Sequence, residues 1–298
     1  MSDVFKIRVV SPWFGELKLP QAHFSTAFST EESDALLCDW APADELLSCA
    51  KRKAWYCCEP YCQFRGLGRG SWPGQRKALR DAEFLSHNHE VPCFRVPHVT
   101  HFETLTVDHR GDRSDRAVAI VSNHGGNPWK AHADLRYRSQ FITHDLVDLY
   151  GRSAWKKYRK GRFSLPSTPR NYKGEIPGDW PGGAKRDLMA SYQVAVCLEN
   201  MSEAYYFTEK FIEAVCAGCV PVYRAHPSVA AGVLKGAIWF DPADYGHEPA
   251  LTINAALASN ANEVRRVNEK WLAGEAVAAT HHSAVFARIA AILQSPVA

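Results

Sequence analysis

The sequence predicts an α/β protein of two domains, each built around a parallel sheet. Its 298 residues suffice for two domains of about 100–200 residues each. Hydrophobic residues make up 46% of the chain and charged residues 22%, an ordinary balance for a protein that buries a core. In the second half, strand-like and helix-like stretches alternate. This alternation predicts parallel strands joined by right-handed crossovers.

The first half contains short apolar stretches that predict strands. The run 6–14 ends its strand at Pro12, and the run 53–58 stops at Glu59 and Pro60, since proline ends a sheet ladder. The segment 31–52 has leucines and a tryptophan at helical spacing and predicts a helix. Residues 65–75 form a glycine-rich loop, and 91–99 and 102–107 are expected to be extended.

A charged stretch separates the two halves. Residues 108–116, DHRGDRSDR, are the least apolar part of the chain and predict a linker. We therefore expect one domain over 1–112 and a second over 117–298 that includes the C-terminal helices.

The second half follows a sharper pattern. Residues 152–184 predict a long loop. Expected strands lie at 117–121, 145–150, 193–198 and 220–223, and expected helices at 131–143, 208–217 and, as two segments, 260–293.

The composition of the chain limits the cell compartments and the classes of partner that we expect. The N-terminus lacks the pattern of a signal peptide, and no run of 18 apolar residues predicts a transmembrane helix. The net charge of +3 gives no reason to expect nucleic acid and leaves peripheral membrane contact open. The odd number of cysteines, nine, predicts free thiols in a cytoplasmic protein.

Two groups of cysteines allow an alternative interpretation as a zinc or redox site. The first group is Cys57, Cys58 and Cys62, and the second is Cys216 with Cys219. A structural zinc site needs four ligands, whereas Cys216 and Cys219 lie in an apolar helical stretch where small buried residues are expected. Buried thiols are therefore the simpler interpretation, and we expect no metal site.

One segment combines a strand end, a polar loop and a helix start. Glu199 and Asn200 follow the predicted strand 193–198, and Thr208, Glu209 and Lys210 begin the next helix. Ligands of α/β sheets bind beyond the carboxyl ends of strands, and a helix N-terminus favours phosphate. Tyr205 or Tyr206 could stack on a ring. The simpler alternative is that Thr208 only caps the helix, with Glu209 complementing its dipole and Lys210 in solvent.

The same segment resembles the signature of the α-1,3/4-fucosyltransferases, glycosyltransferase family 10. The resemblance runs through Glu199-Asn200, Tyr206–Lys210, Gly218, Val220–Val222 and Pro227-Ser228. Weaker similarities, in the same order as in the family, are KIRVVSPWFG, KAWYCCEP, and AVAIVSN followed by DLVDLYG. Met201 departs from the serine that often follows this motif, and residues 152–184 have no counterpart.

This resemblance implies the GT-B architecture, with two Rossmann-like domains facing across a cleft. The N-terminal domain would bind a glycan acceptor, and the C-terminal domain would bind GDP-fucose as donor. It further implies inverting transfer with Glu59 as the general base, and Arg136 and Lys210 stabilising the departing diphosphate. No cofactor is expected, because the chain lacks an Asp-x-Asp pair after a strand to hold a metal ion.

The arginine of the family has two candidate positions here. Counting from Ser122 reaches Lys130, and counting back from Val147-Asp148 favours Arg136. The expected donor-binding residues are Ser122, Asn123, Lys130, Arg136, Glu199, Asn200, Tyr206, Thr208, Glu209 and Lys210.

Two alternatives to fucosyl transfer stay open at this point. One is a transferase for another GDP-sugar, and the other is a catalytically silent homologue that binds a sugar nucleotide. Retention of Glu59 favours an enzyme over a silent homologue.

Overall fold

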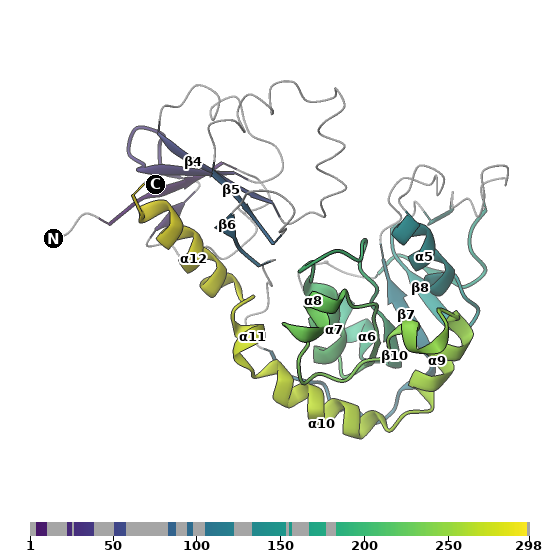
Figure 1. The fold of residues 1–298 in the computed structure, drawn as a ribbon. Helices are drawn as coiled ribbons and strands as arrows, with labels where there is room; N and C mark the ends of the chain where they lie inside the picture. Colours follow the sequence, from purple (N-terminus) through teal and green to yellow (C-terminus); the bar gives the residue numbers. More distant parts are fainter. Residues whose placement is uncertain are drawn as a thin grey trace. The chain divides into compact units, whose positions relative to one another are not determined.

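The computed structural model describes a chain of two compact units (Figure 1). The described residues are 4–10, 23–25, 27–38, 51–57, 83–87, 94–97, 105–121, 133–152, 155–156, 167–176 and 183–296. The first unit comprises 1–103, 203–206 and 275–298, and the second comprises 104–202 and 207–274. Each unit contains one parallel sheet, as the sequence predicts.

The sheet of the first unit has the strand order β2-β1-β3-β4-β5-β6, with every described pairing parallel. This order matches a doubly wound α/β sheet whose first strand lies inside the sheet. Its strands are β1 (Ile7–Val9), β2 (Phe24–Ser25), β3 (Ala35–Cys38), β4 (Arg52–Cys57), β5 (Glu83–Ser86) and β6 (Phe94–Arg95).

Strand β3 corrects one prediction. The leucine spacing in 31–52 predicts a helix, but Ala35–Cys38 form a strand with all four residues buried. It pairs with β1 on one side and β4 on the other. A central strand covered on both faces is a short continuous apolar run, which periodicity alone cannot tell from a buried helical turn.

The last helix of the chain also departs from expectation. Helix α12 (His282–Gln294) belongs to the first unit, not to the second domain. Its buried face, which includes Val285 and Ile289, joins the core of the first sheet, and Phe286 meets Phe24 edge-on with ring centroids 5.2 Å apart. Arg52 of β4 donates to the carbonyls of Leu293 and Ser295, which the end of α12 leaves without helical partners.

The sheet of the second unit has the order β11-β10-β7-β8-β9, again with parallel pairing. Its strands are β7 (Ser114–Ile120), β8 (Val147–Tyr150), β9 (Tyr172–Gly174), β10 (Tyr192–Val196) and β11 (Val220–Val222). Strand β9 lies inside the stretch 152–184, which the sequence predicts as a loop. The prediction misses this strand because three residues are too few to show a hydrophobic period.

Helices connect these strands and continue to the end of the unit. They are α5 (Ala133–Ile142), α6 (Ala184–Met189), α7 (Glu209–Cys216), α8 (Pro227–Ala231), the 3₁₀ helix η3 (Pro242–Tyr245), α9 (Pro249–Leu257) and α10 (Ala261–Leu272). The short helix α11 (Glu275–Ala278) precedes α12. Helices α5, α9 and α10 contribute buried apolar side chains to the core of the second sheet.

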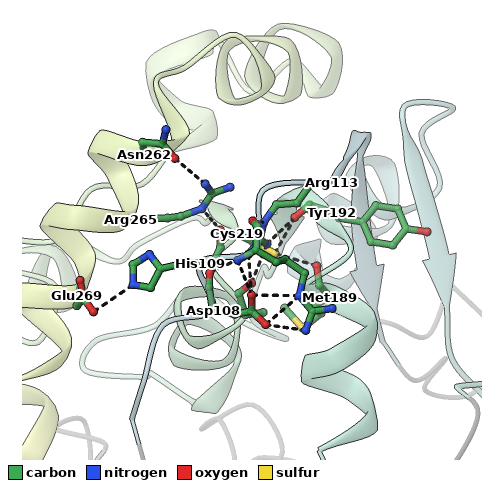
Figure 2. A network of polar contacts seen from close by, with 12 residues as sticks. Asp108, His109, Arg113, Met189, Tyr192, Cys219, Asn262, Arg265 and Glu269 are labelled. Atoms are coloured by element: carbon green, nitrogen blue, oxygen red, sulfur yellow. Dashed lines mark hydrogen bonds and ion pairs between the residues drawn. The ribbon is translucent and has the colours of Figure 1, made fainter.

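The predicted linker is not a free connection. Ser114, Asp115 and Arg116 belong to β7, and Asp108 and Arg113, both labelled in Figure 2, contact the residues at the C-terminal end of α7. The Asp108 amide donates to the Cys216 carbonyl at 2.8 Å, and the Arg113 guanidinium donates to the carbonyls of Ala217 at 2.8 Å and Tyr192 at 3.1 Å. The Arg113 side chain is 2% exposed, so its guanidinium is hydrogen-bonded by these carbonyls in place of water.

The C-x-x-C pair lies inside the second unit. Cys216 and Cys219 are buried free thiols, and burial raises the pKa of each to about 12. The Cys219 thiol donates to the Met189 carbonyl at 3.2 Å (Figure 2). These contacts fit the interpretation of buried thiols. The side chains of Cys57, Cys58 and Cys62 lie outside the described residues.

A substitution at Gly218 tests how tightly residues 108–113 pack against the end of α7. The φ of Gly218 is +70°, and a Cβ there would lie 2.0 Å from the Asp108 carbonyl oxygen. Gly246 has a similar φ of +64° but open space around it. We expect Gly246→Ala to cost about 1–2 kcal/mol, the penalty of the left-handed conformation alone. Gly218→Ala should cost about 3 kcal/mol or more in urea unfolding. Equal losses would show that the segment moves aside freely.

Candidate functional site

The second sheet reverses its direction of growth between β7 and β10. From β7 the chain builds β8 and β9 on one side, and β10 and β11 then lie on the other. Ligands of doubly wound sheets bind outside the carboxyl ends of the strands at such a switch point. Strand β10 leads there into Leu198–Met201. Strand β7 leads into Val121 and then into Ser122 and Asn123, which lie outside the described residues.

The buried carboxylate of Glu199 is the centre of a polar cluster at this point. Its side chain is 3% exposed, yet both oxygens accept hydrogen bonds. The Thr208 amide and hydroxyl donate to Oε1 at 2.8 Å each, and the Tyr223 hydroxyl donates to the same oxygen at 3.2 Å. Lys210 Nζ donates to Oε2 at 3.1 Å. A buried carboxylate is tolerated when it is paired in this way.

Lys210 is held from three sides. Its ammonium also donates to Thr208 Oγ1 at 2.9 Å and lies 3.6 Å from Glu209 Oε1. Burial disfavours the charged ammonium, but the attraction of Glu199 and Glu209 outweighs it and raises the pKa of Lys210. Lys210 is therefore a permanent cation near the helix start, and two of its three N–H donors are used by Glu199 and Thr208.

Thr208 connects the carboxylate to the helix. It caps α7 with an extended backbone, and its hydroxyl accepts from the Lys210 amide at 3.5 Å. The capping role considered from the sequence is thus confirmed, although the same hydroxyl also contacts Glu199 and Lys210 Nζ. The cap and the polar cluster are one feature, not alternatives.

Among the described residues, Arg138 contacts the loop of this cluster, and sequence analysis missed it. It is buried on α5 and its Nη1 donates to Oδ1 of Asn200. Arg136, on the same helix, is exposed, and Lys130 lies outside the described residues. Two residues along a helix turn a side chain by about 200°. A signal for Arg138 does exist in the sequence: YRS places it near Phe141 and Ile142, which share the buried face.

A small recess opens beside the cluster. Its empty volume is about 210 Å³, including solvent at its mouth, and it is lined by Asp134, Tyr137, Arg138, Leu198, Glu199, Met201, Ser202 and Arg224.

The wall of the recess away from Glu199 carries a second charged group. Arg224 pairs with Asp134 at 2.7 Å, and its guanidinium lies 4.6 Å from the centroid of the Tyr137 ring. Asp134 also accepts from the Ser202 amide at 3.1 Å. Burial raises the pKa of Tyr137 to about 12, so its hydroxyl stays neutral at physiological pH. The wall combines a neutral aromatic ring with a fixed cation.

The predicted residues thus divide into four groups. Glu199, Asn200, Thr208, Glu209 and Lys210 lie together in the structure, and their role as donor ligands stays a prediction. Arg136 is exposed on α5. Tyr206 is buried in the first unit, with its ring centroid 5.0 Å from that of His87. Glu59, Ser122, Asn123 and Lys130 lie outside the described residues, so their roles stay predictions.

Two negative findings apply to the described part of the chain. There, no three side chains of the histidine, cysteine or acidic type form a group that could hold a metal ion. No helix in this part has both the length and the apolar character needed to cross a membrane.

The chain is similar in structure to solved glycosyltransferases. An α1,3-fucosyltransferase matches with a TM-score of 0.53 at 13% identity, covering 98% of this chain and 91% of that one. A UDP-forming α,α-trehalose-phosphate synthase from Burkholderia xenovorans matches with a TM-score of 0.55 at 11% identity, covering 91% and 75%.

An α-glucosyltransferase, solved with UDP-glucose and DNA containing an abasic site, matches with a TM-score of 0.53 at 13% identity, covering 89% and 82%. No family model matches the sequence, and no curated protein matches it. At such low identity these similarities establish the fold. The chain has the α/β fold of the GT-B glycosyltransferases, with two Rossmann-like units.

Substitutions at Thr208 test the shared cap and cluster. Thr208→Val keeps the shape but removes the hydroxyl that caps α7 and donates to Glu199. We expect it to lower the free energy of unfolding by about 2 kcal/mol, the loss of a cap together with a buried hydrogen bond. Thr208→Ser keeps the hydroxyl and should cost much less. Urea unfolding measures both, and indistinguishable variants would mean that the hydroxyl contributes nothing to the fold.

Proposed function

We propose that this protein is a glycosyltransferase that takes its sugar from a nucleoside diphosphate sugar, with GDP-fucose as the first candidate donor. The observation that carries the proposal is the pairing of Lys210 with Glu199 and Thr208 at the switch point, with Arg138 beside it. This arrangement offers an oriented cation and a helix start where a diphosphate would need both.

The chemistry follows from these groups. The acceptor hydroxyl loses its proton to a base, and its oxygen attacks the anomeric carbon of the donor sugar. The bond from this carbon to the diphosphate oxygen breaks, and the diphosphate leaves with the electron pair. Glu199 and Thr208 accept hydrogen bonds from two of the three N–H groups of Lys210, and the Arg138 guanidinium donates to Asn200. Both would stabilise the negative charge that grows on the leaving group.

Three parts of the proposal come from the resemblance to the α-1,3/4-fucosyltransferases. They are fucose as the transferred sugar, inversion at the anomeric carbon, and Glu59 as the base. The structural similarity to an α1,3-fucosyltransferase supports the choice of donor to test first. The similarity to an α-glucosyltransferase and to a UDP-forming trehalose-phosphate synthase keeps other nucleotide sugars as the second candidate. We further propose that transfer needs no metal ion, because Lys210 and Arg138 would supply the positive charge.

The donor assignment predicts selective stabilisation by guanine nucleotides. A ligand that binds only the folded protein at 100 times its Kd adds about 2.7 kcal/mol of stability. We expect GDP and GDP-fucose to raise the melting temperature and UDP and UDP-glucose to leave it unchanged. Stabilisation by the uridine nucleotides alone would transfer the proposal to a UDP-sugar. Stabilisation by neither class would contradict a sugar-nucleotide site.

The three candidate cations on and before α5 can be separated by substitution. We expect Arg138→Ala to weaken GDP binding and to lower turnover by about 100-fold or more, as loss of a leaving-group donor does. Arg136→Ala, in an exposed position on the same helix, is the matched control and should stay near the wild-type rate. If Arg136→Ala or Lys130→Ala is inactive and Arg138→Ala is not, the cation that contacts the diphosphate is one of the two sequence candidates.

A further inference from the structure

The turn Glu203–Tyr206 presents an aromatic ring to solvent at a cost in backbone energy. The Tyr206 amide donates to the Glu203 carbonyl at 3.2 Å, which closes a four-residue turn. Its third residue, Tyr205, has a φ of +62°. This position favours glycine or asparagine, and a bulky residue there is a genuine outlier. Tyr205 as a whole residue is nevertheless 46% exposed.

Both ends of the turn are fixed to one histidine. His87 directly follows β5 and is buried, and its Nε2 lies 3.0 Å from Oε1 of Glu203. The rings of His87 and Tyr206 lie 5.0 Å apart. Strain in a backbone persists only where the surroundings enforce it, and here the contacts on either side of Tyr205 do so. The backbone that carries the Tyr205 ring is therefore fixed on both sides.

The position of the turn indicates a ligand site of the first unit. His87 lies at the carboxyl end of β5 in an entirely parallel sheet, the edge where α/β domains bind ligands. Glu203–Tyr206 belongs to this unit, whereas the donor cluster around Glu199 belongs to the second. The ionic residue of the turn, Glu203, is acidic and disfavours an anionic ligand such as a nucleotide. An exposed tyrosine beside a carboxylate suits a neutral ring with hydroxyl groups.

We propose that Tyr205 is a stacking residue that binds a pyranose ring of the acceptor. This inference rests on the proposed glycosyltransferase function, because it assigns the first unit the acceptor of that reaction. The C–H face of a sugar ring packs against an aromatic face, and the neighbouring carboxylate can accept hydrogen bonds from sugar hydroxyls. His87 acts through Glu203 and Tyr206 and is a positioning residue.

Two substitutions separate the ring from the turn that carries it. Tyr205→Gly removes the ring and suits the positive φ, so the turn should keep its shape and the urea midpoint should stay equal or rise. Tyr205→Phe keeps the ring. Leu251→Ala is the control for loss of an exposed apolar side chain, because Leu251 is 59% exposed on α9.

The probes are the methyl pyranosides of galactose, glucose, N-acetylglucosamine and fucose, titrated by saturation-transfer NMR. We expect at least one to bind the wild type, Tyr205→Phe and Leu251→Ala alike, and to bind Tyr205→Gly about tenfold more weakly. Equal binding by Tyr205→Gly, or no saturable binding to the wild type, would overturn the proposal.

Melting with GDP, measured on the same variants, identifies which idea fails. If Tyr205→Gly loses its response to GDP, the ring belongs to the donor and the acceptor assignment is overturned. If GDP stabilises none of the proteins but pyranoside binding depends on Tyr205, the inference stands as a sugar site and the nucleotide-sugar function fails.

Discussion

A single buried carboxylate holds the candidate donor site together. Glu199 lies near the start of the loop that follows β10, and its partners Thr208, Lys210 and Tyr223 come from the start of α7 and the end of β11. Removing any one partner would leave part of a buried charge unsatisfied, which costs more than the lost contact itself. The carboxylate therefore fixes the helix start, and through it the direction in which Lys210 points.

Helix α7 connects the Glu199 cluster to a second group of polar contacts at its own C-terminus. Its N-terminus belongs to the Glu199 cluster, and its last carbonyls receive Asp108, Arg113 and, through Gly218, Arg265 at 2.7 Å. Asp108 and Arg113 thus bind the helix that carries Lys210. Both ends of α7 use charged side chains to satisfy backbone groups that a helix leaves unpaired. The buried apolar residues between them, among them Phe211 and Ile212, keep the helix fixed against the core.

The second unit was the more predictable because its signals agree with one another. Strands β7, β8 and β10 each contain three consecutive buried residues, and Thr208 and Gly218 bound α7 at the residues where the structure begins and ends it. Local preference, cap and burial favour the same element in each case. The positions of Glu199, Thr208 and Lys210 in the candidate site could be predicted for the same reason. They follow a strand end and begin a helix, and the sequence identifies both.

What the sequence does not reveal depends on contacts between distant residues. Ala35–Cys38 is a strand because β1 and β4 lie on either side of it, and α12 joins the first sheet because Phe24 and Arg52 contact it. Neither partner is visible in local spacing. The same holds for Arg138, which differs from Arg136 only in the side of α5 that it occupies. Counting from a motif locates the helix in the sequence but not which of its faces is buried. Phe141 and Ile142 pack in the core of the sheet and so fix the rotation of α5 about its axis. This rotation decides that Arg138, and not Arg136, reaches Asn200.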